Sequence, residues 1–175
     1  PGLRYHQVEP APEVTMRTGA IAIMLFAGLS RLARAGCRWE EWGLHYAAYN
    51  PPTLEALYSN AWWEAARTWV GLHPPLYPLI HSVGSLAFPS PWVWGAFSAM
   101  CSMAAVALLL HAHPKTLMPA LLLATDPVQL HYAAEVNNYP LSVLLISAAW
   151  WAVRTERTWL LTLTVILSAW THVMA

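Results

Sequence analysis

The chain has 175 residues, of which 57% are hydrophobic and only 10% are charged. A typical soluble domain carries about 25% charged residues; a soluble fold of this size could not cover its surface with so few, whereas lipid can replace water around apolar faces. Nine basic residues balance nine acidic ones, which excludes the strongly basic surface of a nucleic-acid-binding protein.

Residues 1–15 contain three prolines, which predicts an unstructured lead-in on the cytoplasmic side. The first apolar helix is expected over about residues 16–35. Its uncharged centre is short for a membrane span, which needs about 20 residues. Arg17 and Arg31 flank that centre, and each can extend its charged head to the interface, so a span is still expected. Because the chain starts at Pro1 rather than at a methionine, we expect a piece of a longer protein.

Residues 36–91 differ from the rest of the chain. Five tryptophans stand beside glutamates and arginines within residues 36–72. From Thr53 onward, apolar and charged positions share one helical wheel, which is typical of a helix lying in the membrane surface. The apolar piece over residues 73–88 is short for a span. The pattern therefore predicts one external loop over residues 36–91 with surface-lying helices.

Four further apolar segments follow this loop, at about residues 92–110, 116–132, 139–153 and 158–173. Pro119 and the pair Asp126–Pro127 are expected to interrupt the second of them. Basic residues stand at alternate ends of the spans, which the positive-inside rule assigns to the cytoplasm. We therefore predict an all-α fold, a polytopic transmembrane helical bundle with surface-lying helices in the first extracytoplasmic loop.

Two adjacent acids, Glu40 and Glu41, stand between tryptophans in this external loop. One of them can act as a general base toward an acceptor hydroxyl or amine. Together they can also help to hold a divalent metal ion. The alternative is a solvated acidic turn beside interfacial aromatic residues, because acids near a membrane surface cost little free energy.

Other candidates are single residues. Glu135 lies in a short loop on the same predicted side and is either a functional acid or a solvated one. Asp126 is an intramembrane acid and so a functional candidate, unless Pro127 beside it serves only to break the helix. His73 precedes two prolines and can bind an anion such as phosphate at a helix start, or can be an interfacial histidine. The same alternative applies to His172.

A second group of patterns carries less information. His111 and His113 have a possible metal-ligand spacing, but they fall on the side opposite to the acids, so we interpret them as a basic turn. The sequence contains no glycine-rich phosphate loop, no Cys-x-x-Cys pair and no Gly-x-Ser-x-Gly turn. Nucleotide chemistry of the soluble kind is therefore unsupported.

Four motifs stand in a fixed order along the chain: Glu40–Glu41, the His-Pro-Pro-Leu-Tyr segment from His73 to Tyr77, the Tyr-x-x-Glu segment from Tyr132 to Glu135 with Tyr139, and Thr171–His172. This order resembles the membrane glycosyltransferases of the GT-C fold, and most closely the bacterial members of the dolichyl-phosphate-mannose protein mannosyltransferase superfamily. The resemblance covers about residues 18–175. It departs from the family pattern at Glu40, where Asp is usual, at Asp126–Pro127, where Ser-Pro is usual, and after Glu135, where Arg usually follows Glu-Ala.

The resemblance implies transfer of a sugar from a polyprenyl-phosphate-linked donor to an extracytoplasmic acceptor, either a protein or a lipid, at a bacterial inner membrane. It implies that Glu40 is the catalytic base with Glu41 beside it. A divalent metal is a possible cofactor, with Glu40 and Glu135 as possible ligands. The residues implied to bind substrate are His73, Tyr77, Glu135, Tyr139 and His172.

The alternative function is a non-catalytic membrane protein, either a transporter module or an assembly subunit. A transporter places polar residues near the bilayer midplane, often in broken helices, and the pair Asp126–Pro127 favours this alternative. A transferase gathers its acids at one external surface, as Glu40, Glu41 and Glu135 do in the predicted topology. A soluble helical bundle is disfavoured, because successive uncharged runs approach spanning length.

Overall fold

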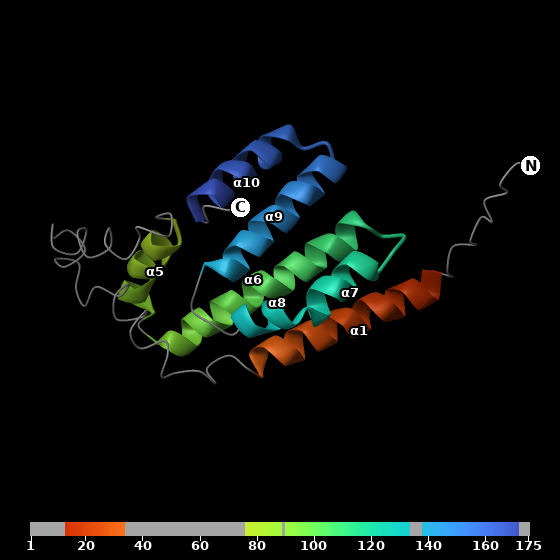
Figure 1. The fold of residues 1–175 in the computed structure, drawn as a ribbon, viewed down its shortest axis with the longest axis horizontal. Coiled ribbons are helices and arrows are strands. Elements are labelled where there is room, and N and C mark those ends of the chain that lie inside the picture. Colours follow the sequence, from red (N-terminus) through yellow and green to blue (C-terminus); the bar gives the residue numbers. More distant parts are fainter. Residues whose placement is uncertain (1–12, 34–75, 89, 134–137, 172–175) are drawn as a thin grey trace, which may run out of the picture.

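The computed structural model describes residues 13–33, 76–88, 90–133 and 138–171, and every regular element within them is an α-helix (Figure 1). The prediction of an all-α chain is therefore confirmed for this part of the protein. The lead-in and most of the external loop, including the helix expected from Thr53, lie outside the described residues. The helices are α1 (Glu13–Leu32), α5 (Leu76–Ala87), α6 (Pro91–Ala112), α7 (Met118–Thr125), α8 (Pro127–Tyr132), α9 (Tyr139–Arg154) and α10 (Thr158–Thr171).

The bounds of the helices differ by only a few residues from those of the predicted apolar segments. One expectation within these segments is corrected. Pro119 does not interrupt its segment, because it lies in the first turn of α7. A proline is tolerated there, since the N–H groups of a first turn have no intrahelical partner. The second expected interruption is present, because Asp126 separates α7 from α8.

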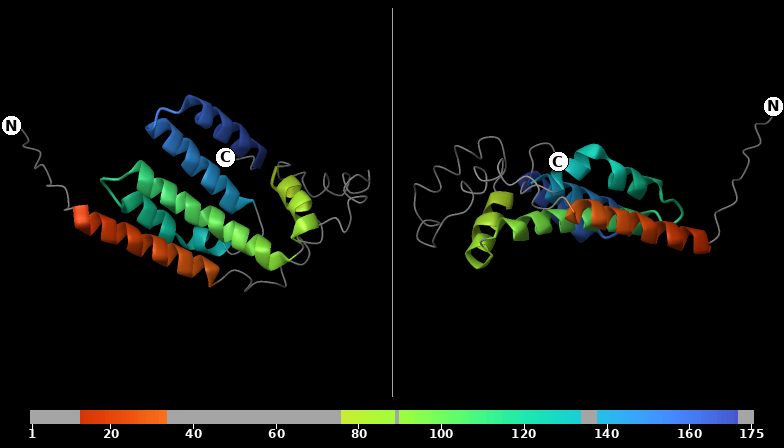
Figure 2. Two further views of the ribbon diagram at one scale, coloured as in Figure 1. Left: turned by 180° about the vertical axis from the view of Figure 1, so that it is seen from behind. Right: turned by 90° about the horizontal axis from the view of Figure 1, so that it is seen from below.

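Helix α6 is the centre of the bundle and packs against α1, α7 and α9. Helix α10 packs against α9 and also contacts α5. Two ends of the bundle are visible in Figures 1 and 2. One end holds the start of α1 and the turns that follow α6 and α9; we call it the basic end, after Arg17, Lys115, Arg154 and Arg157. The opposite end holds α5, the start of α9 and the end of α10, and we call it the α5 end.

Many small residues are buried between the helices, and many large apolar residues are exposed. Leu29 is 70% exposed, Trp159 is 66% exposed and Ile21 is 61% exposed. Larger side chains, among them Trp94, Leu141 and Leu145, are also buried. The buried small residues include Ala27, Ala99, Ala105, Ala120, Ala124, Ser98, Ser102, Ser142, Ser147 and Ser168.

Helix length gives a separate, narrower observation. Within the described ranges, the segment Trp92–Ala112 is the one helix that is both long and apolar enough to cross a membrane. The helix Thr158–Thr171 is equally apolar in character but shorter. A single helix of this kind also occurs in the cores of soluble proteins.

Candidate functional site

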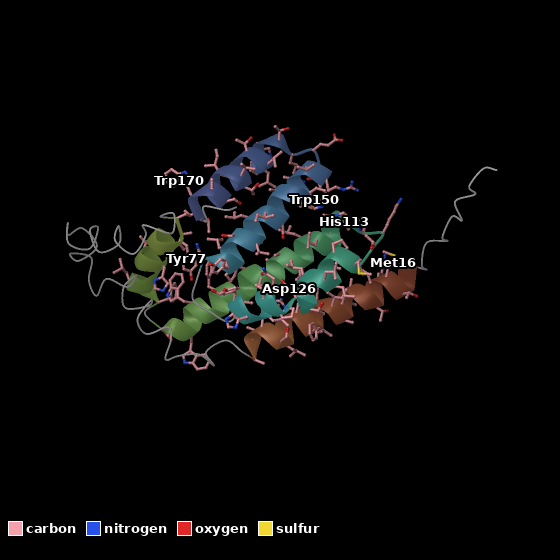
Figure 3. The ribbon with its side chains drawn as sticks, viewed as in Figure 1. Met16, Tyr77, His113, Asp126, Trp150 and Trp170 are labelled. Atoms are coloured by element: carbon pink, nitrogen blue, oxygen red, sulfur yellow. The ribbon has the colours of Figure 1, made fainter. Side chains whose placement is uncertain are left out.

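The structure describes two of the predicted site residues, Tyr77 and Tyr139. Both lie at the α5 end of the bundle; Figure 3 labels Tyr77 there. The other predicted residues lie outside the described part of the chain. These are Glu40, Glu41, His73, Glu135 and His172.

Tyr77 is a buried residue, with only 2% of its side-chain surface exposed. It packs in an apolar cluster with Trp94 and Cys101 of α6 and with Leu141 and Leu145 of α9. It lies in the first turn of α5. In this arrangement Tyr77 joins α5 to two other helices and so fixes the position of α5.

A ring stack continues from Tyr77 across the same interface. The ring of His81, one turn further along α5, is fully buried and lies 4.4 Å from the ring of Trp94, measured between centroids. The indole N–H of Trp94 donates to the Phe88 carbonyl oxygen at 3.0 Å. Gly84 permits this approach, because a Cβ atom there would lie 2.5 Å from the Trp94 ring. Trp94 therefore lies directly against α5.

Tyr139 begins α9 and is half-buried. Its ring lies 4.4 Å from that of Tyr132, the last residue of α8. The ring of His131 lies a further 5.1 Å from Tyr132. Three rings thus stand together at the point where α8 ends and α9 begins, on the two sides of residues 134–137.

A buried hydrogen bond ties α9 to α10 at the same end. The side-chain amide of Asn138 donates to the Thr171 carbonyl oxygen at 2.8 Å. The Asn138 carbonyl oxygen in turn accepts from the Ser142 hydroxyl at 3.0 Å. Asn138 is 6% exposed and Thr171 is fully buried. The role of Asn138 is not visible in the sequence, because its partner Thr171 lies in α10, 33 residues away.

The break between α7 and α8 leaves two backbone carbonyls without their usual helical donors. Pro127 has no N–H, so it cannot bond to the carbonyl oxygen of Leu123 four residues earlier. The N–H of Val128 would reach Ala124 in an unbroken helix, but it donates to the Asp126 carboxylate at 3.2 Å instead. Asp126 therefore caps α8, and the carbonyls of Leu123 and Ala124 need other partners.

Arg31 supplies those partners from α1. Its terminal nitrogens donate to the Leu123 carbonyl oxygen at 3.1 Å and to the Ala124 carbonyl oxygen at 3.2 Å. Its Nε donates to the Ser102 hydroxyl of α6 at 2.7 Å. The guanidinium thus joins three helices at the point where α7 ends.

The position of Arg31 corrects the expectation that its head extends to the interface, because the residue is fully buried. The backbone accounts for the difference. Carbonyl oxygens at the C-terminal end of α7 carry partial negative charge, and the guanidinium presents several donors in one plane. All the acceptors found for Arg31 among the described residues are neutral oxygen atoms.

An open cavity lies beside this break. It has a volume of about 600 Å³, and Asp126 is the charged residue on its wall, together with Thr125, Pro127 and three leucines. Figure 3 places Asp126 at the junction of α7 and α8, between the two ends of the bundle. No group of three His, Cys, Asp or Glu side chains suited to a metal ion occurs within the described ranges. Glu40 and Glu135, the possible metal ligands, lie outside them.

No protein-family model, no curated protein and no solved structure matches the chain. The function is therefore argued from the residues and from their arrangement. The two features that carry chemistry in the described part are the cluster at the α5 end and the broken helix held by Arg31.

Proposed function

We propose that the chain is part of a polytopic membrane glycosyltransferase of the GT-C type. It transfers a sugar from a polyprenyl-phosphate-linked donor to an acceptor outside the cytoplasm. The observation that supports the proposal is that Tyr77, Tyr139 and Thr171 all belong to elements at the α5 end. The resemblance draws these residues from three separate motifs that lie far apart in the sequence.

The distribution of side chains supports the membrane part of the proposal. Helices in lipid approach one another through small residues, because lipid chains are as apolar as leucine and large side chains gain nothing by turning inward. The described helices bury many alanines and serines, and they expose several leucines, isoleucines and tryptophans. At 1.5 Å per residue, the 22-residue α6 is roughly 33 Å long, which matches a hydrocarbon core of about 30 Å.

The proposed reaction assigns the base role to Glu40. Its carboxylate takes the proton from the acceptor hydroxyl as the acceptor oxygen bonds to the anomeric carbon of the sugar. The bond between that carbon and the phosphate oxygen breaks, and its electron pair leaves with the polyprenyl phosphate. In this proposal Glu41 stands beside the base, and Glu135 and His73 line the region of the donor phosphate. Glu40 and Glu135 would hold a divalent metal there, and His172 binds substrate in the same site.

The two described tyrosines support different roles. The ring of Tyr77 is buried among α5, α6 and α9, which favours positioning of the donor region over direct contact. The half-buried ring of Tyr139 lies against Tyr132. An aromatic pair of this kind offers a flat apolar face, which suits the carbon face of a sugar ring or an isoprenoid chain.

The test is sugar transfer in membranes that contain the full chain, with a panel of polyprenyl-phosphate sugars as donors. Removing a general base by Glu40→Gln is expected to lower the rate by about 10²-fold or more. Glu156→Gln is the matched control, because it makes the same chemical change at the opposite, basic end. The proposal fails if no donor supports transfer. An unchanged rate in the Glu40 variant with transfer intact would move the base assignment to Glu41.

The second candidate is a transporter module, and the broken helix favours it. Transporters place discontinuous helices beside substrate or ion sites. Here Asp126 lies on the wall of an open cavity at such a break. The Asp126 carboxylate also accepts a hydrogen bond from the Val128 N–H and so caps α8. This role gives the break a purely structural explanation. The absence of transfer with every donor, together with solute uptake into vesicles that depends on Asp126, would favour this candidate.

A further inference from the structure

A second cavity lies near the basic end, between α7 and α9 with α6 as its floor. Its volume is about 430 Å³. Nearly all of its wall is apolar and comes from Leu109, Leu123, Val143 and Ile146. A groove of this composition fits a hydrocarbon chain, because it offers few polar partners to anything else.

A histidine–tryptophan pair stands at the basic end of the groove. The indole N–H of Trp150 donates to Nε2 of His113 at 2.7 Å, and the two rings stack at 16° with their centroids 5.8 Å apart. Figure 3 shows both residues at this end of the bundle. Because Nε2 accepts this hydrogen bond, the imidazole carries its proton on Nδ1. His113 therefore has one N–H to donate, the one on Nδ1.

Basic side chains surround this pair. Arg154 follows Trp150 by four residues, so both stand on the face of α9 that lines the groove. Lys115 follows His113 in the turn after α6. Both are exposed. Arg157 lies in the turn after α9, and its guanidinium carbon is 4.9 Å from the centroid of the Trp151 ring. Glu156 is the one acid in these two described turns, so the end of the groove is positively charged.

We propose that this groove binds an anionic phospholipid. One acyl chain lies in the apolar groove, and the phosphate lies near Lys115, Arg154 and the Nδ1–H of His113. The charge selects an anionic head group, since each basic residue near a membrane surface adds to the attraction for such lipids. The apolar length of the groove selects a ligand with an attached chain over free phosphate.

The inference rests on the proposed membrane placement and not on the sugar-transfer reaction. The groove reaches His113 and Trp150 near the basic end, whereas Tyr77, Tyr139 and Thr171 belong to α5, the start of α9 and the end of α10 at the α5 end. Loss of transfer in the Glu40 variant therefore leaves the lipid proposal untouched. A chain that fails to enter any bilayer would overturn both.

The experiment places the full chain in nanodiscs and measures tryptophan quenching by lipids brominated on the acyl chain. Brominated phosphatidylglycerol and phosphatidylcholine are compared at equal mole fractions. The expected result is a preference for phosphatidylglycerol that falls about fivefold for each of Lys115→Gln and Arg154→Gln. Arg17→Gln is the matched control, because it removes a charge from the same end but from a helix that does not line the groove. An equal loss in that control, or no preference at all, would overturn the proposal.

A second pair of variants tests the acyl chain. Val143→Phe fills the groove and is expected to weaken binding of both lipids severalfold. Val165→Phe adds the same volume on the exposed face of α10 and is expected to leave binding unchanged. If soluble glycerol phosphate displaces phosphatidylglycerol, or if the Val143 variant binds as well as the natural chain, the groove holds no acyl chain and the proposal is wrong.

Discussion

A single side chain can set the distance between two helices, and Gly84 and Trp94 show this at the α5 end. Trp94 presses its ring against α5 at the position where Gly84 has no side chain. It also donates to the Phe88 carbonyl oxygen just beyond the end of α5. The Tyr77 and His81 rings pack along the same surface. The position of α5 therefore depends on one missing methyl group.

We expect Gly84→Ala to destabilise the fold by about 1–3 kcal/mol, the usual cost of overpacking an interface. The added methyl would meet rigid indole carbons at 2.5 and 2.6 Å. Gly28→Ala is the matched control, since its methyl would meet only the flexible end of Met103 at 3.1 Å. The measurement is the free energy of unfolding in mixed detergent micelles. Equal effects of the two substitutions would contradict the close packing described for Trp94.

At the scale of the element, the α7–α8 break is held together by a residue from another helix. Arg31 donates to the two carbonyls that the break leaves free. A buried carbonyl without a partner costs about 1–3 kcal/mol. Burying a cation also costs free energy, so the net effect of removing Arg31 is a difference between two large terms. A double-mutant cycle separates them.

The second partner in that cycle is Pro127→Ala, which restores an N–H that bonds to the Leu123 carbonyl oxygen once Asp126, at ψ 120° in this structure, takes a helical ψ. Arg31→Met is expected to lower the free energy of unfolding in both backgrounds. We expect this loss to be smaller by about 1 kcal/mol or more in the Pro127→Ala background, a coupling within the range seen for residues that share a partner. Thermal unfolding of the four proteins gives the coupling. A coupling near zero would show that Arg31 does not serve the carbonyls of the broken helix.

The sequence predicted the helices better than the contacts between them. Apolar runs separated by proline and charge marked the helices, and Asp126–Pro127 marked the break correctly. Pro119 was misjudged, because a proline in a first turn and one in a helix interior look alike until the helix start is known. The partners of Arg31 could not be predicted, since they lie 92 and 93 residues away. The hydrogen bond from Asn138 to Thr171 was missed for the same reason.

The candidate site was predictable only in part. Tyr77 and Tyr139 were singled out by motif, and the structure places both at one end of the bundle. The burial of Tyr77 did not follow from its motif, because it depends on Trp94, Leu141 and Leu145 from other helices. The pairing of His113 with Trp150 likewise required the packing of α9 against α6. Spacing along the chain shows which residues share a helix face, but not which helix they meet.

At the scale of the whole molecule, the two ends of the bundle differ in chemistry. The basic end carries Arg17, Lys115, Arg154 and Arg157, whereas the α5 end carries buried aromatic rings. In the membrane placement that we propose, the positive-inside rule would put the basic end in the cytoplasm. In the proposed membrane placement the two ends therefore face different compartments.

Cysteine labelling tests this orientation. After Cys37 and Cys101 are replaced by serine, a cysteine at Glu156 is expected to react with a membrane-impermeant maleimide only after the cells are opened. A cysteine at Phe88, which is 57% exposed at the α5 end, is expected to react in intact cells. Labelling of both positions from the same side would exclude the proposed topology.

The bond between Arg31 and α7 also constrains how the chain is made. Arg31 leaves the ribosome 92 residues before Leu123, so at 5–20 residues per second its partners arrive roughly 5–20 s later. In the proposed membrane placement, α1 would enter the bilayer with a guanidinium whose acceptors on α7 do not yet exist. Arg31 would then stay near the water or beside the insertion machinery until α7 arrives. The final depth of α1 would thus depend on a helix that is made later.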